Sequence, residues 1–565
     1  MRNIEFLVGT SDFEKARKNN GYYVDKTGLI LSLLTQSTPE VTLITRPRRF
    51  GKTMGMSMLA TFFDIRKDSQ AMFEGLEISK NAALCSEWMN QWPTLFLSLK
   101  GVEGKNFAAA RERLQGRIAS LCRMHRYLST SEKVDRNDLK DFQRLADRAD
   151  GDPTDDMLSN SVALMMQMMQ DHFGKPVILL IDEYDVPLAK ASENGYYKEM
   201  LELVKGLMGD ALKDNVNLKF AVITGCLRIA KESIFTGTNN FVSDTISSSN
   251  LNEYFGFTQA EVDTILRDIH RTERTEEIRN WYDGYHFGDL DVYCPWDVMN
   301  YVRDLQKDPQ AKPASYWKNT SGNEIIRSFI DYAGENVAEK LERLLSGGFI
   351  IQKIREDLTY DYLHSSEENL WSVLYLTGYL TLVRDTDLTQ RPPKGSVALK
   401  IPNMEVQEVF EDTIQEWFDQ SAQSWNRSSM FDALWSGDSE RLTAEMNDLL
   451  NRTISYHDYK EDFYHAFLAG ILAGAGYSVE SNREHGEGRS DIVVYNRKKR
   501  QVAIFEAKYA KSLDSLQESC TTALRQIKDR EYAKEFEGKY DSILRYGIAY
   551  YKKRCLVLKS TDTVN

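Results

Sequence analysis

Short, almost uniformly apolar runs alternate with longer amphipathic stretches over the first 250 residues. The runs are rich in aliphatic and β-branched residues, which suits parallel strands that are buried on both faces. The stretches between them, such as residues 107–125 and 159–172, have helical spacing. This alternation is typical of an α/β domain with a central parallel sheet. The predicted strands are Val41–Thr45, Thr94–Leu99, Val177–Ile181 and Lys219–Thr224.

The pattern changes between residues 251 and 400, where aromatic residues become dense, as in WYDGYHFG and VYCPWDV. Helical stretches there are followed by the apolar run Leu370–Val383 and a loop containing Pro and Gly, Arg391–Gly395. We therefore expect helices followed by a short hairpin, which resembles a winged helix. Such a module binds DNA in some proteins and is a lid or a packing module in ATPases. Residues 401–450 have helical spacing and are predicted to form a connector.

Charge separates the end of the chain from the rest. The 565 residues include 71 Lys and Arg and 84 Asp and Glu, a formal net charge of −13, which excludes a protein that coats nucleic acid with its whole surface. Residues 451–565, in contrast, contain 20 Lys and Arg against 16 Asp and Glu. We therefore expect four regions: 1–250, an α/β domain; 251–400, a helical and winged-helix-like region; 401–450, a helical connector; and 451–565, a separate C-terminal domain.

Neither the cysteines nor the apolar stretches indicate export or a membrane. The six cysteines are scattered without a CxxC pair, which indicates reduced thiols rather than a disulfide framework. The N-terminus lacks the pattern of a signal peptide, and the most membrane-like stretch, Phe463–Tyr477, is too short to span a bilayer. We expect a soluble cytoplasmic protein without a membrane partner, and a homo-oligomer is left open.

A phosphate-binding motif follows the first predicted strand. In RPRRFGKT, Gly51, Lys52 and Thr53 occupy the last three positions of the P-loop pattern, and a helical stretch follows. Backbone N–H groups at such a turn bind phosphates, Lys52 would reach the β- and γ-phosphates, and Thr53 would ligate Mg²⁺. The first position is Arg46 and not Gly, so Arg46, together with two further arginines, is expected to add positive charge around the phosphates; those two are Arg48 and Arg49.

Two later strands end in residues that suit the same site. The run VILLIDEYD ends in Asp182, expected to hold Mg²⁺, and Glu183, expected to polarise the attacking water. Thr224, at the end of KFAVIT, is placed to sense the γ-phosphate, and Arg228 to contact phosphate within or between subunits. The run TLFLSL lies between the two motifs in the sequence and is expected to supply the extra strand that separates them in the sheet. These features predict a site for ATP and Mg²⁺.

The C-terminal region contains a predicted hairpin that carries two carboxylates and a lysine. Asp491 opens the first strand, NRKKR forms the turn, and the second strand, QVAIFEAKY, carries Glu506 and Lys508 two residues apart on one face. Two carboxylates suit Mg²⁺ or Mn²⁺, and the lysine suits activation of water at a phosphate. Glu461, which opens an upstream helix, is a third candidate ligand. The alternative is a solvated surface hairpin whose basic turn, Arg497–Arg500, has no ligand.

This arrangement resembles the PD-(D/E)XK nuclease superfamily, with Ser490 in place of the proline and Gln526 matching the glutamine of the helix that follows. Nearly the whole chain resembles bacterial AAA-ATPase-like proteins fused to such a nuclease, through VDKTGLI, RPRRFGKT, IDEYD, FGFT, WYDGY, NTS and EGRSDIVV. The resemblance implies an α/β fold with a STAND-like P-loop ATPase, a helical and winged-helix middle region, and a C-terminal restriction-endonuclease-like domain.

Two functions follow from these predictions. The first is an ATP-controlled, Mg²⁺-dependent nuclease that cleaves nucleic acid, with DNA as the expected substrate, in defence against foreign DNA. The second is a nucleotide-dependent switch whose nuclease fold only binds nucleic acid or a protein partner. The intact set of Asp491, Glu506 and Lys508 favours the first. A third alternative, a metabolic kinase, leaves the C-terminal domain without a role.

Overall fold

The computed structural model divides the chain into two compact units. The first lies within Met1–Gly322 and Gly347–Val409, and the second within Asn323–Ser346 and Phe410–Asn565. The structure describes residues 5–35, 39–147, 151–228, 241–317, 340–341, 343–356, 358, 367–413, 428–453, 468, 472, 478–485, 488–552 and 554–560, the side chains of 367, 385, 428, 451–453, 478, 481–485, 488–491 and 498 excepted.

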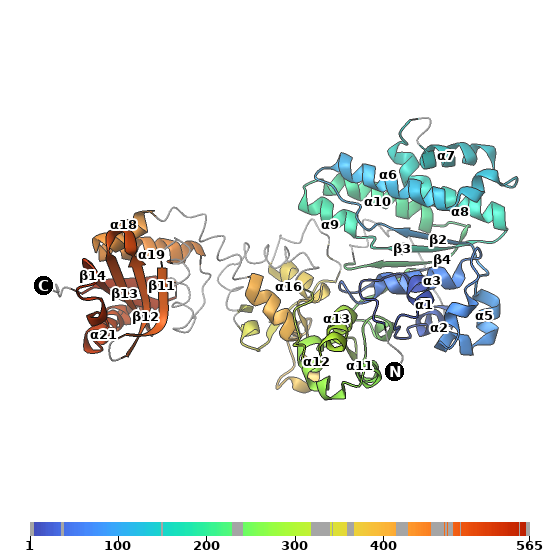
Figure 1. Ribbon diagram of the computed structural model, residues 1–565. Helices are drawn as coiled ribbons and strands as arrows, with labels where there is room; N and C mark the ends of the chain where they lie inside the picture. Colours follow the sequence, from blue (N-terminus) through green and yellow to red (C-terminus); the bar gives the residue numbers. More distant parts are fainter. Residues whose placement is uncertain are drawn as a thin grey trace. The chain divides into compact units, whose positions relative to one another are not determined.

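The first unit is built on a five-stranded parallel sheet, as the alternating pattern predicts (Figure 1). The strand order is β2-β3-β4-β1-β5, so β4 separates the strand before the P-loop from the strand that ends in Asp182. The expectation that TLFLSL would separate them is wrong, because this run is β2, at the edge of the sheet. The strands are β1 (Val41–Thr45), β2 (Thr94–Ser98), β3 (Val177–Asp182), β4 (Leu218–Gly225) and β5 (Phe241–Asp244).

Helices cover both faces of this sheet (Figure 1). On one face, odd-numbered strand residues such as Leu179 pack against the long helices; on the other, Ile178 and its even-numbered neighbours pack against α3. The first layer contains α6 (Phe107–Met124), α7 (Arg136–Asp147), α8 (Asp155–Phe173), α9 (Val186–Glu193) and α10 (Tyr197–Leu212). The second contains α1 (Phe13–Lys18), α2 (Gly28–Thr35), α3 (Lys52–Phe63), α4 (Gln70–Phe73) and α5 (Ala82–Trp88). Short 3-10 turns join them, η1 (Glu77–Lys80) and η2 (Arg126–Thr130).

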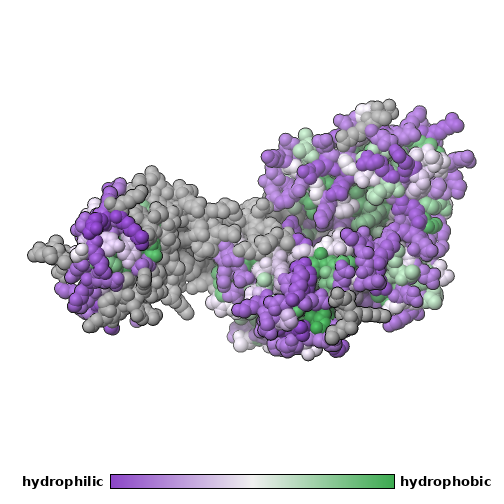
Figure 2. Space-filling view, in the orientation of Figure 1, coloured by the Kyte–Doolittle hydropathy of each residue, from purple (hydrophilic) through white to green (hydrophobic). Residues whose placement is uncertain are grey.

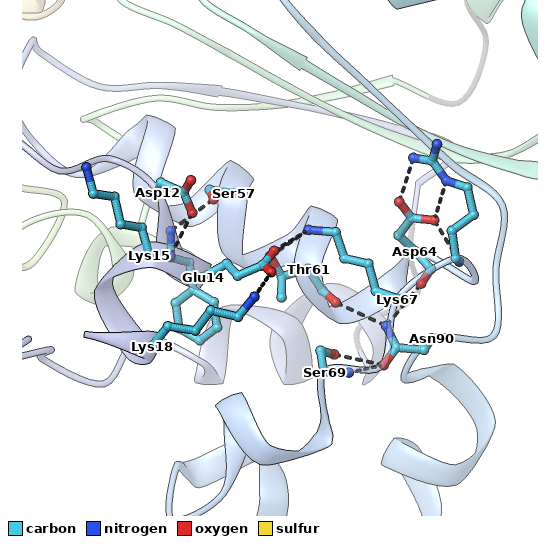
Figure 3. A network of polar contacts seen from close by, with 12 residues as sticks. Asp12, Glu14, Lys15, Lys18, Ser57, Thr61, Asp64, Lys67, Ser69 and Asn90 are labelled. Atoms are coloured by element: carbon cyan, nitrogen blue, oxygen red, sulfur yellow. Dashed lines mark hydrogen bonds and ion pairs between the residues drawn. The ribbon is translucent and has the colours of Figure 1, made fainter. Parts of the chain in front are cut away.

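Polar contacts fix the helix that follows the P-loop (Figure 3). The N–H of Phe13 in α1 donates to Oγ of Ser57 in α3 at 3.0 Å. Lys67 lies 2.9 Å from Glu14 Oε2 and 3.4 Å from Thr61 Oγ1, so it joins the same two helices about one turn further along α3. These contacts hold α1 against α3, the helix that begins at Lys52 directly after the phosphate-binding loop.

The middle region, apart from Asn323–Ser346, belongs to the first unit and has a core of its own, in which the dense aromatic residues are buried. Its first half consists of η3 (Asn252–Tyr254), α11 (Gln259–Asp268), η4 (Thr272–Arg274), α12 (Thr275–Tyr282), the hairpin of β6 (Tyr285–Phe287) with β7 (Leu290–Val292), and α13 (Pro295–Lys307). The second half confirms the prediction of a helix followed by a short hairpin. It comprises β8 (Ile350–Gln352), α16 (Glu367–Leu376), β9 (Thr381–Leu382), η6 (Asp385–Asp387) and β10 (Val397–Lys400), in the antiparallel order β8-β10-β9.

The second unit is a mixed sheet between helices (Figure 1). The strand order is β11-β12-β13-β14-β15, in which only β13 and β14 pair in parallel. The predicted hairpin is confirmed as β12 and β13, joined by η7 (Arg497–Lys499). The strands are β11 (Ser478–His485), β12 (Gly488–Asn496), β13 (Gln501–Tyr509), β14 (Ser542–Tyr551) and β15 (Arg554–Lys559), and the helices are α18 (Ser428–Ser436), α19 (Ser439–Thr453), η8 (Leu513–Ser515), α21 (Leu516–Asp529) and η9 (Lys534–Phe536).

Hydrophilic residues cover most of the visible face of the helices around the first sheet (Figure 2). All six cysteines are free thiols, as their scattered positions in the sequence predict. In the part of the chain that the structure describes, no helix combines the length and the apolar character needed to cross a bilayer.

Candidate functional site

The P-loop turns sharply between β1 and α3. Arg49 and Gly51 have positive φ angles of 74° and 84°, and Gly51 is the N-cap residue of α3. A turn of this kind directs successive backbone N–H groups to one side, beside the N-terminus of a helix of 12 residues. Arg48 is exposed, and the guanidinium of Arg49 lies over the Trp296 ring, 4.1 Å from its centroid. The geometry suits an anion.

Lys52 is directed back onto its own loop. Its Nζ donates to the carbonyl oxygens of Arg46 at 2.8 Å and Pro47 at 2.7 Å, and lies 3.7 Å from Sγ of Cys226. The side chain is buried, with 7% of its surface exposed. Thr53 follows on α3 and is half-buried. The ammonium group is thus satisfied by loop carbonyls, which a phosphate oxygen could replace.

Arg46 does not lie where the sequence analysis expected it. The residue is fully buried, and its guanidinium pairs with the carboxylate of Asp244 and donates to Oδ1 of Asn252 at 2.7 Å. Burial lowers the pKa of this guanidinium, and Asp244 acts against that shift. The expectation that Arg46 adds charge around the phosphates is therefore corrected: its charge is used inside the protein.

The ends of β3 and β4 bring two predicted residues together. Asp182 is fully buried, and its Oδ1 accepts a hydrogen bond from Thr224 Oγ1 at 2.5 Å. Its Oδ2 is also buried and has no hydrogen-bond donor among the described residues. A buried carboxylate oxygen without a partner is costly, and Mg²⁺ prefers such an oxygen. Asp182 therefore fits the predicted metal ligand.

Glu183 follows directly, in a left-handed conformation with φ of 55°. A non-glycine residue in this region is strained by about 1–3 kcal/mol, and such residues concentrate at functional sites. The pKa of Glu183 is raised, and burial is the largest cause. The negative charge of Asp182 raises this pKa further, whereas the positive charges of Lys100 and Lys52 lower it. A carboxyl group with a raised pKa beside a metal ligand suits a residue that binds and polarises water.

Asp185 is a functional candidate that the sequence analysis missed. Its Oδ2 accepts hydrogen bonds from the backbone N–H groups of Cys226 at 2.9 Å and Leu227 at 3.0 Å. These bonds fix the loop after β4, directly before the half-buried Arg228. The signal was present in IDEYD, whose last acid lies two residues beyond Glu183.

In the second unit, Glu506 and Lys508 meet on β13, as predicted. Lys508 Nζ lies 3.0 Å from Glu506 Oε1, and the side chains are 23% and 1% exposed, respectively. Ile504 and Val502, two and four positions before Glu506, pack against Ile527 of α21. Because side chains alternate along a strand, Glu506 and Lys508 lie on the face that α21 covers. A buried carboxylate beside an ammonium group fits a divalent cation and a phosphate better than a solvated turn does.

The remaining predicted nuclease residues are less fully placed. Asp491 lies in β12 next to Ile492, which pairs with Phe505, so continuing the register brings its backbone opposite Glu506. Gln526 lies on α21, and its Nε2 is 3.4 Å from the Tyr532 hydroxyl. Glu461 and the side chain of Asp491 lie outside the described residues. Among the side chains that are described, no three His, Cys, Asp or Glu residues form a metal-binding group.

Two family models match this chain. Residues 7–235 match the model described as Predicted AAA-ATPase, and residues 459–560 match that of the PD-(D/E)XK nuclease superfamily. One chain thus carries a predicted AAA-ATPase domain and a PD-(D/E)XK nuclease domain. Similarity also extends along the whole chain: it is 23% identical over 558 residues, 96% of either chain, to an Azotobacter chroococcum protein described as an uncharacterized protein in the vnfD 5' region.

Both domain families generally use a nucleotide or a divalent metal, and a nuclease domain implies binding of nucleic acid. The matches agree with the fold. The AAA-ATPase match includes β1 to β4, and the nuclease match includes β11 to β15. The P-loop and the β13 pair therefore lie in the two matched domains.

Proposed function

We propose that the first unit binds and hydrolyses ATP, and that this activity controls Mg²⁺-dependent cleavage of nucleic acid by the second unit. We propose DNA as the substrate and defence against foreign DNA as the role. The observation that carries the proposal is the ion pair of the buried Glu506 with the half-buried Lys508, in a chain whose P-loop unit also has the buried carboxylate of Asp182.

On the ATPase side, Thr53 and Asp182 would hold the Mg²⁺ that accompanies the nucleotide. Lys52 would exchange two carbonyl partners for phosphate oxygens, and the exposed Arg48 together with Arg49 would add positive charge. Glu183 would orient the attacking water. Thr224, which is already bonded to Asp182, would respond to the γ-phosphate, and a contact with that phosphate is proposed for Arg228.

On the nuclease side, Asp491 and Glu506, with Glu461 as a further candidate, would hold Mg²⁺ or Mn²⁺. The cation would withdraw negative charge from the scissile phosphate. Lys508 would orient the attacking water and stabilise charge as the phosphodiester breaks. Gln526, from the helix that covers this face, is proposed to support substrate binding. The contact between Lys508 and Glu506 favours this reaction over the switch function. Removing a carboxylate and an ammonium group from water costs free energy, and binding of nucleic acid alone does not require that cost.

Cleavage assays with a matched pair of variants test the proposal. Plasmid, linear DNA and RNA are incubated with the full chain, Mg²⁺ or Mn²⁺, and with or without ATP. Wild type and Lys511→Ala, which removes an exposed lysine just after β13, are expected to cleave DNA. Lys508→Ala is expected to lose at least about a hundredfold in rate, the range typical for a positioned group that acts on the attacking water.

Two outcomes contradict the proposal. Equal cleavage by Lys508→Ala and wild type would show that the activity comes from a contaminant. No cleavage of any substrate by wild type, with binding of nucleic acid retained, would favour the nucleotide-dependent switch.

A further inference from the structure

Arg46 occupies the P-loop position that the usual motif gives to glycine, yet nothing in the backbone there requires glycine. Among the described loop residues, positive φ angles occur at Arg49 and Gly51 and not at Arg46. A side chain is therefore tolerated at position 46. The burial of a charged arginine side chain at this position still requires an explanation.

The guanidinium of Arg46 joins the entry of the loop to the end of β5 and to the segment that follows this strand. Nη1 donates to the carbonyl oxygens of Thr45 at 2.8 Å and Asp244 at 3.0 Å, while Nη2 contacts the Asp244 carboxylate and Asn252. Asp244 and Asn252 are themselves 2% and 3% exposed. A buried, charge-assisted bond of this kind tolerates little displacement.

Aromatic rings of the middle region complete the surroundings. The guanidinium lies 5.4 Å from the ring centroid of Phe255 and 5.8 Å from that of Phe287. Phe287 also packs against Phe50, at the other end of the loop, with 5.0 Å between ring centroids. One side chain of β6 thus contacts both the entry and the exit of the P-loop.

The same residue bears directly on Lys52. The carbonyl oxygen of Arg46 accepts from Lys52 Nζ, and the N–H of Arg46 donates to the carbonyl of Gly225, at the end of β4. The position of the Arg46 backbone therefore sets where the lysine lies relative to the strand ends.

We propose that Arg46 is a positioning residue for nucleotide binding, which acts through Asp244 and does not touch the phosphates. Its charge fixes the loop entry to the end of β5, so that the N–H groups of the loop and Lys52 are held in the arrangement that accepts ATP. This inference rests on the proposed ATP binding and adds the residue pair that shapes the site.

A double-mutant cycle on ATP affinity separates this role from a direct contact. ATP with Mg²⁺ is titrated calorimetrically into wild type, Arg46→Met, Asp244→Asn and the double variant, and each free energy of unfolding is measured separately. If Arg46 acts through Asp244, each single variant weakens ATP binding by roughly tenfold and the double variant by little more than either. Arg46→Lys should recover part of the loss, since one ammonium group replaces the charge but not the fork.

Arg66→Met provides a matched control. It removes an exposed arginine that is paired with Asp64 at 2.7 Å, after the far end of α3, and ATP affinity should stay within about twofold of wild type. An affinity loss in Arg46→Met with none in Asp244→Asn would overturn the proposal in favour of a direct phosphate contact. If Arg46→Met, Asp244→Asn and the double variant all bind ATP with wild-type affinity, and only their free energy of unfolding is reduced, the role of Arg46 is purely structural. Failure of wild type to bind ATP would refute the proposed function itself.

Discussion

Lys52 is the residue whose partners must change if ATP is to bind. Its two carbonyl acceptors satisfy the ammonium group inside a buried site, so the charge is already placed at the loop and needs only a short displacement. Cys226 Sγ, 3.7 Å away, marks the side on which β4 ends.

Lys52→Ala removes that charge and is expected to weaken ATP binding by about 1.5–3 kcal/mol, or roughly 10- to 150-fold in Kd. Lys67→Ala, which removes a lysine paired with Glu14 near the other end of α3, is the control and should bind ATP as wild type does. Titration of ATP into both variants measures the difference. Wild-type affinity in Lys52→Ala would mean that the phosphate loop has been assigned wrongly.

Glu183→Gln is expected to bind ATP but to lose hydrolysis, because an amide cannot accept the proton of the attacking water. Stability adds a second test. The pKa of Glu183 is raised in the folded protein, so the folded state binds the proton more tightly than the unfolded state does. The ionised carboxylate therefore costs stability that increases as pH rises above the ordinary Glu value of about 4.3.

Glu183→Gln should consequently increase the free energy of unfolding at pH 7.5, with the increase disappearing toward pH 4. Denaturant unfolding at the two pH values measures it. A variant that is less stable at pH 7.5 than wild type would show that the carboxylate makes favourable contacts.

Individual side chains show where prediction from sequence ends. Lys52, Asp182 and Thr224 were predicted because each follows a recognisable strand, and the structure brings them to one edge of the sheet. For Arg46 the motif alone predicts a position at the phosphates, which is wrong. Its partners Asp244 and Asn252 are 198 and 206 residues away, and no local pattern reveals such pairings.

At the scale of elements, the order of strands decides which residues meet. The strand between β1 and β3 is β4, which comes late in the sequence, so sequence order alone wrongly predicts TLFLSL at that place. In contrast, the β12–β13 hairpin is local, and its register could be predicted from the alternation of apolar residues and the short basic turn. That α21 covers the face of β13 with Glu506 and Lys508 could not be predicted from the sequence, because it depends on tertiary packing.

The loop after β4 depends on Asp185. Asp185→Ala leaves two backbone N–H groups without their acceptor, at a cost of about 1–3 kcal/mol, and releases the segment that precedes Arg228. We expect ATP turnover to fall more than ATP affinity, because the phosphate loop itself is unchanged. Asp185→Asn retains an acceptor oxygen and should recover part of the turnover. Steady-state ATPase kinetics separate the two effects, and an unchanged kcat in Asp185→Ala would refute the assignment.

At the scale of the whole molecule, the middle region is well placed to respond to ATP. It contacts the P-loop through Phe287, through Trp296 beneath Arg49, and through Gly378, where an added Cβ would lie 3.0 Å from Cβ of Pro47. Gly378 has a φ of 89°, so the turn before β9 both requires glycine and brings the backbone close to the loop. Movement of the loop on nucleotide binding would therefore displace the middle region directly.

The most direct test of the central claim is the rate of DNA cleavage as a function of ATP in four proteins. Wild type should show an ATP-dependent change in cleavage rate, and Lys52→Ala should show none. Glu183→Gln should keep the cleavage rate of the ATP-bound state, because it binds ATP but does not hydrolyse it. Lys508→Ala should lose cleavage while it retains ATPase activity. A cleavage rate that is the same with and without ATP in wild type, and unchanged in Lys52→Ala, would contradict control of the nuclease by the ATPase unit.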